Sequence, residues 1–196
     1  MCKFSEDSKR KLGNAIIYIA DHTEQLSKTK LLKLLFLMEE YMVKRYHVPF
    51  LGLPFEVWQA GPVAKDVFID LSDGPFLLKD FIKTEVQKDA IYVKAVKPFC
   101  DDEFSACEME MMDIIICKYG NKTAKQLVNE VHQEGSLWLN AAKRHGLLDA
   151  FRKGICNNSD YTIDFSEGLS DCAQEDYKES LAIRQTANML KAQAHV

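Results

Sequence analysis

The chain has 196 residues, and 47% of them are hydrophobic, which is enough for one globular domain with a buried core. The formal net charge of −4 and the dispersed basic residues argue against binding to nucleic acid or to anionic membranes. The most apolar run, residues 31–38, contains a lysine and is far shorter than the ~20 residues of a membrane span. No apolar leader of the signal-peptide kind opens the sequence. We therefore expect a single cytoplasmic domain over residues 1–196.

Two helices are predicted at the start of the chain. Ser5 or Ser8 is expected to cap the first helix, which ends near residue 21. Ser27 is expected to cap a second helix that ends near residue 46. The second helix is apolar on most sides, which is typical of a helix at the centre of a domain. Its polar residues are expected to form a thin polar stripe: Lys30, Lys33, Glu40 and Lys44.

The middle of the chain mixes breakers with a β-rich segment. Pro49 and Pro54 exclude a long helix over residues 48–58, because each removes a donor and restricts the preceding residue. Gly61-Pro62 is expected to begin a third helix, since proline at the first helical position costs no hydrogen bond. Residues 81–97 alternate in a β-rich pattern and predict a small β-hairpin.

Further helices are predicted in the second half from their capping residues. Asp101 or Asp102 is expected to cap a helix over residues 103–118. Thr123 and Ser136 are expected to cap two short helices that end near residues 133 and 144. The final helix, within residues 171–196, is predicted to carry one apolar face: Ile183, Ala187 and Leu190. The predicted fold is mainly α with a small β-hairpin (α+β), a single compact domain of about six to seven helices.

No motif for catalysis, a metal or a cofactor stands out. The histidines include no His-Glu-x-x-His pair, and the glycines form no phosphate-binding loop or nucleophile elbow. Cys107 and Cys117 fall within a helical pattern and are expected to be buried thiols. The adjacent acids Glu39-Glu40 are expected to be solvated. We expect no enzyme, no metal and no cofactor, with Cys or His hydrolase chemistry near His132 as an alternative.

The segment Trp58-Gln-Ala-Gly61-Pro62-Val63 is the most distinctive part of the sequence. It couples a large aromatic side chain to a glycine that permits close backbone approach and to a proline. One interpretation is a corner of the fold, in which each residue serves packing or turning. The other is that this corner also shapes a binding surface.

Three sequence pieces occur in order: Lys30-Leu-Leu-Lys-Leu-Leu-Phe36, Glu56-Val-Trp58 and Gly61-Pro62-Val63. A second block, residues 127–138, contains His132 and ends at Trp138. Together these pieces resemble the Panacea domain family of SocA-like antitoxins, also labelled phage-associated GepA-like proteins. The resemblance spans about residues 12–145. The chain departs from the family pattern in having His47 where a glycine is common and Ala60 where an aromatic is usual.

The resemblance implies an antitoxin of a bacterial or prophage toxin–antitoxin pair, which neutralises a cognate protein toxin by direct binding. One branch of the family implies an alternative, a proteolytic adaptor that delivers the toxin to a cellular protease. A transcriptional regulator is disfavoured by the acidic balance. The resemblance implies no catalytic residues. The family-motif and candidate partner-binding residues are Trp58, Gly61, Pro62, Val63, His132 and Trp138, to which residue type adds Arg45 and Tyr46.

Overall fold

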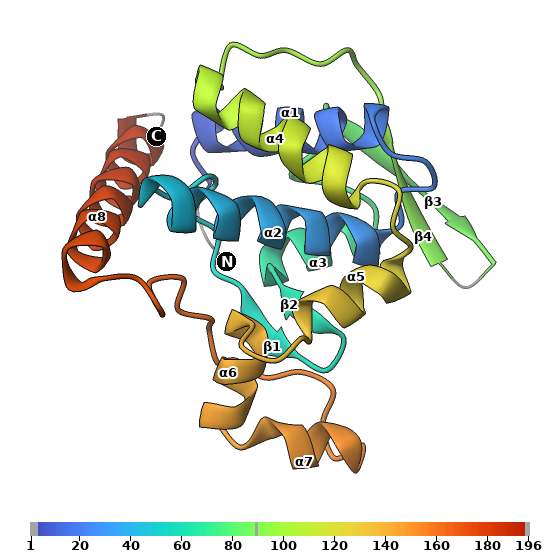
Figure 1. Ribbon diagram of the computed structural model, residues 1–196. Coiled ribbons are helices and arrows are strands. Elements are labelled where there is room, and N and C mark those ends of the chain that lie inside the picture. Colours follow the sequence, from blue (N-terminus) through green and yellow to red (C-terminus); the bar gives the residue numbers. More distant parts are fainter. Residues whose placement is uncertain (1–3, 89, 195–196) are drawn as a thin grey trace.

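The computed structural model describes residues 4–88 and 90–194, which form eight helices and two antiparallel hairpins (Figure 1). The elements are α1 (Glu6–Asp21), α2 (Lys28–Tyr46), β1 (Glu56–Trp58), β2 (Gly61–Val63), α3 (Lys65–Ser72), β3 (Ile82–Gln87), β4 (Ala90–Ala95), α4 (Ala106–Tyr119), α5 (Ala124–Val131), α6 (Leu137–Arg144), α7 (Leu147–Arg152) and α8 (Asp171–Ala194). The mainly helical α+β prediction is confirmed, with more helices than expected and a second hairpin. Within the described ranges, no helix is long and apolar enough to cross a membrane.

Helix α2 lies at the centre of the molecule and packs against α1, α3, α4, α5 and the hairpin strand β2 (Figure 1). Its cap is the predicted one, because Ser27 Oγ accepts a hydrogen bond from the Lys30 backbone N–H at 3.3 Å. Two members of the predicted polar stripe, Lys30 and Lys33, are buried, as is Glu39. An element surrounded on all sides buries even its polar residues, and these must then find partners inside the protein.

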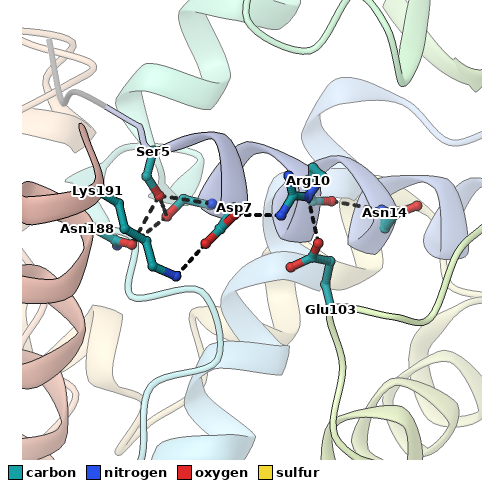
Figure 2. Close-up of polar contacts among 8 residues, drawn as sticks. Ser5, Asp7, Arg10, Asn14, Glu103, Asn188 and Lys191 are labelled. Carbon is teal, nitrogen blue, oxygen red and sulfur yellow. Dashed lines mark hydrogen bonds and ion pairs between the residues drawn. The ribbon is translucent and has the colours of Figure 1, made fainter. Parts of the chain in front are cut away.

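A network of polar contacts joins the first helix to the last (Figure 2). Ser5 caps α1, as predicted, and its hydroxyl also donates to Asn188 Oδ1 of α8 at 3.2 Å. Lys191 of α8 forms an ion pair with Asp7, and Arg10 Nε donates to Glu103 at 2.7 Å (Figure 2). The two ends of the described chain are therefore held side by side.

The predicted helix start at Gly61-Pro62 is wrong, because these residues form strand β2 and the third helix begins at Lys65. Val57 of β1 lies opposite Pro62, and its N–H points outward to the Tyr161 carbonyl at 2.9 Å. In this non-hydrogen-bonded pair, the position of Pro62 requires no N–H donor toward β1. Proline at this strand position therefore costs no hydrogen bond between β1 and β2.

Three predictions about α4 and its neighbours can be compared with the structure. Ser105, not Asp101 or Asp102, caps α4 through a capping box with Glu108. The expectation of buried thiols is wrong, since Cys107 and Cys117 are both exposed. The caps of α5 and α6 at Thr123 and Ser136 are confirmed. The short helix α7 follows Gly146 directly and was not predicted.

Helix α8 faces the protein with a side other than the predicted one. Ala173 and Tyr177 are buried, whereas Ile183 and Leu190 of the predicted apolar face are 63% and 62% exposed. Arg184 binds the Phe50 carbonyl from the inner side of the helix. The apolar spacing on α8 was read correctly, but that face points to solvent.

Candidate functional site

The hairpin β1–β2 forms one wall of the candidate site, and Trp58 lies at its end. The Trp58 indole N–H donates to Glu56 Oε2 at 2.9 Å, and its ring meets Phe68 edge-on at 4.9 Å. The side chain is half-buried. Trp58 is thus fixed by its own strand and by α3, with part of its ring open to solvent.

The second sequence block binds directly to the first. Trp138 in the first turn of α6 is 3% exposed, and its indole N–H donates to the Trp58 carbonyl at 2.9 Å. The His132 ring, at the end of α5, stacks on Trp138 with 3.7 Å between ring centres. Residues about 80 positions apart in the chain therefore meet in one cluster.

Lys33 of α2 connects this central helix to the β1–β2 hairpin. Its Nζ donates to the Pro62 carbonyl at 2.7 Å, and the residue is 1% exposed. Gly61 has φ +96°, and a Cβ there would lie 2.8 Å from Lys33 Cε and 2.9 Å from Val131 Cγ2. The close approach expected at this glycine is therefore real, and the group that it admits is the lysine stem. We call Lys33, Gly61, Pro62, His132 and Trp138 the hairpin anchor.

The hairpin anchor holds two bases in apolar surroundings. Burial lowers the pKa of Lys33 to about 7, and among the described residues it forms no ion pair with a carboxylate. Burial, and secondarily the charge of Lys33, lowers the pKa of His132 to about 4. The Nε2 atom of His132 is buried and has no hydrogen-bond partner in the described part of the chain. The anchor therefore favours uncharged amine and imidazole groups.

A second buried polar group, Glu39, organises the proline-bounded loop after α2. Its carboxylate accepts hydrogen bonds from the backbone N–H groups of Phe50, Leu51 and Gly52 at 2.8–3.2 Å. Burial raises the pKa of Glu39, while these donors and Arg184 act in the opposite direction. The expectation that Glu39 is solvated is wrong, because an irregular loop packed on the core needs acceptors for its N–H groups.

The predicted site residues differ in accessibility. Four of the six are buried, and only Trp58 and His132 reach the surface in part; the buried ones are Gly61, Pro62, Val63 and Trp138. Arg45 and Tyr46 lie elsewhere, at the end of α2, where Tyr46 lines a groove of about 530 Å³ with Met42 and Ile183. In the described part of the chain, no three side chains gather as a metal site requires.

A family model described as antitoxin SocA-like, Panacea domain, matches residues 31–139, which is more than half of the chain. The chain belongs to the Panacea family. Searches of curated proteins and of solved structures gave no match.

The Panacea match begins in α2 and ends in α6, so it contains every residue of the hairpin anchor. Lys33 and Glu39 were not identified from the sequence as buried partners. The available signal was a polar residue inside an almost wholly apolar helix. The departure at His47 also has a structural counterpart, since its φ of +57° is a conformation that glycine adopts without strain.

Proposed function

We propose that this Panacea protein is an antitoxin that neutralises a cognate protein toxin by binding it directly. The observation that supports this role is the family match over residues 31–139. The burial of four motif residues is consistent with this role. Their contacts hold a corner of the fold in place, and a partner would bind the surface around that corner. Trp58 is the motif residue best suited to touch a partner, being large, aromatic and half-buried beside that corner.

The test is co-expression with the product of the adjacent gene, scored first by growth and then by co-purification with the tagged Panacea protein. We expect the neighbour to be toxic alone, harmless in the presence of this protein, and present in the purified complex. A neighbour that is harmless alone and does not co-purify would contradict the antitoxin role.

A variant pair then tests the contact surface. Trp58→Ala should weaken the complex by roughly 30-fold in Kd, as loss of a tryptophan hot spot of about 2 kcal/mol does. Phe76→Ala is the matched control, because Phe76 is 79% exposed and lies outside the motif. Equal Kd values for the two variants, both folded by circular dichroism, would exclude Trp58 as a contact.

The two alternatives have less support. An adaptor needs a docking segment, and α8 instead packs one face on the protein through Ala173 and Tyr177, as a helix that closes the core does. An unchanged toxin half-life in the presence of this protein would argue for masking rather than delivery to a protease. For hydrolase chemistry, His132 would need a hydroxyl or thiol nucleophile that it can activate through a hydrogen bond; its ring instead stacks on Trp138, and its Nε2 atom has no hydrogen-bond partner among the described residues.

A further inference from the structure

Lys33 is an unusual group to place in the centre of a protein. Among the described residues, the Nζ atom has one hydrogen-bond acceptor, the Pro62 carbonyl at 2.7 Å, and the side chain is almost wholly removed from water. An ammonium carries three donors, so two would be without an acceptor among the described residues. Because a buried, unpaired charge is costly, this site stabilises the uncharged amine relative to the ammonium.

Among the described residues, no carboxylate forms an ion pair with Lys33, and burial is the cause of its lowered pKa. On α2 itself, the nearby Lys30 directs its Nζ to the Glu24 carbonyl. Strand β2 contributes Gly61, Pro62 and Val63, which do not titrate. Helix α5 contributes Val131 and, at its end, His132, whose own pKa is lowered in part by the charge of Lys33. The titratable group that faces Lys33 is therefore another base.

The hairpin has several attachments to the rest of the protein, and they differ in their response to pH. Three of them use backbone carbonyls and uncharged N–H donors: Val57 N to Tyr161 O, Gln59 N to Asn157 O and Trp138 Nε1 to Trp58 O. Those donors do not titrate near neutral pH. The bond from Lys33 to Pro62 has a donor that changes its charge near neutral pH. Lys65 also forms an ion pair with Glu56 of β1, and the pKa of Lys65 is raised, chiefly by its hydrogen bond to Asp160.

We propose that Lys33 positions the β1–β2 hairpin against α2 as an uncharged amine, and that opening of the hairpin takes up one proton on that amine. When the hairpin is closed, one N–H donates to Pro62 and the nitrogen keeps its lone pair. When the hairpin opens, water reaches Nζ, and the lone pair accepts a proton from solvent to give a hydrated ammonium. This coupling concerns the fold itself and does not depend on the antitoxin role.

The direction of the pH effect follows from the two pKa values. The pKa of Lys33 is about 7 in the closed hairpin and about 10.5 when the amine is exposed. Between these values the open form binds more protons, so opening becomes more favourable as pH falls from 10.5 toward 7 and then levels off. Linkage gives an opening constant about 50-fold larger at pH 7 than at pH 9. Below about pH 6.5, protonation of His132 adds a separate contribution.

Hydrogen exchange of the hairpin amides in the full chain measures this opening. We would record exchange of residues 56–63 at pH 7, 8 and 9, corrected for the intrinsic rate at each pH, and titrate the Lys33 ¹³Cε resonance by NMR. The expected result is a roughly 50-fold rise in opening from pH 9 to pH 7, with Lys33 titrating near pH 7.

Two variants separate the lysine from general effects of pH. Lys33→Met keeps the apolar stem and should abolish the pH dependence of hairpin opening between pH 7 and 9. Lys30→Met is the matched control, since Lys30 is 5% exposed on the same helix and binds away from the hairpin; it should behave as wild type. The same pH dependence in both variants would overturn the proposal. If Lys33→Met does not fold, the wild-type chain alone still tests the proposal. Titration of Lys33 near pH 10.5 would overturn the proposal, and so would hairpin exchange that does not depend on pH.

Discussion

At the residue scale, the hairpin anchor depends on a position where a side chain cannot fit. Gly61 combines a positive φ with contact to Lys33 and Val131, so two separate constraints select glycine there. The sequence predicted close approach at Gly61 from its place beside Trp58 and Pro62. It did not identify the approaching groups, because they belong to α2 and α5, 28 or more residues away on either side.

Gly61→Ala should lower the free energy of unfolding by about 2–4 kcal/mol, because the new Cβ meets packed atoms and the backbone is strained. Gly154→Ala is the matched control: φ is +66°, and nothing lies within 4 Å of an added Cβ, so only about 1 kcal/mol is expected. Urea unfolding of both variants measures the difference. Equal losses would show that the anchor tolerates a side chain.

At the element scale, local signals predicted the regular helices well, and long-range contacts decided the rest. The caps at Ser27, Thr123 and Ser136 were predictable because a hydroxyl satisfies N–H groups only three residues away. The hairpin β1–β2 was missed because its strands have three residues each and their outer bonds reach residues 157–163. No periodicity is visible in so short a strand.

The loop over residues 50–52 provides an element-scale prediction. Glu39→Ala should lower the free energy of unfolding by about 3–5 kcal/mol, because three loop N–H groups lose their acceptor inside the protein. Glu39→Gln keeps one acceptor oxygen, so its free energy of unfolding should fall by less than that of Glu39→Ala. Glu40→Ala, on the partly exposed neighbour, is the control and should change stability by under about 0.5 kcal/mol. Chemical denaturation of the three variants orders them, and a Glu39→Ala loss below 1 kcal/mol would contradict this role.

At the scale of the whole molecule, one continuous hydrophobic core extends from Leu12 in α1 to Tyr177 in α8. It includes Trp138 and Phe151 outside the central helices, so α6 and α7 are part of it. Elements that share one core unfold together. The single domain expected from the sequence therefore predicts one cooperative unfolding transition.

Calorimetry should record one unfolding transition with equal calorimetric and van't Hoff enthalpies. The enthalpy should be about 140 kcal/mol near 60 °C, from about 0.7 kcal/mol per residue. Separate melting of α8, followed by a second transition, would contradict a single domain. A variant with Tyr177→Ala should melt earlier and still in one step, because Tyr177 belongs to the same core.

The burial of the family motif has a consequence for how such proteins diversify. Residues such as Gly61 and Trp138 are constrained by the interior, whereas exposed positions on α4 and α8, including Ile114, Ile183 and Met189, are free of that constraint. Under the proposed antitoxin role, two relatives that share the whole signature would recognise different toxins through these exposed positions. A library that randomises those exposed positions while preserving the hairpin anchor is the natural starting point for selecting new toxin pairings.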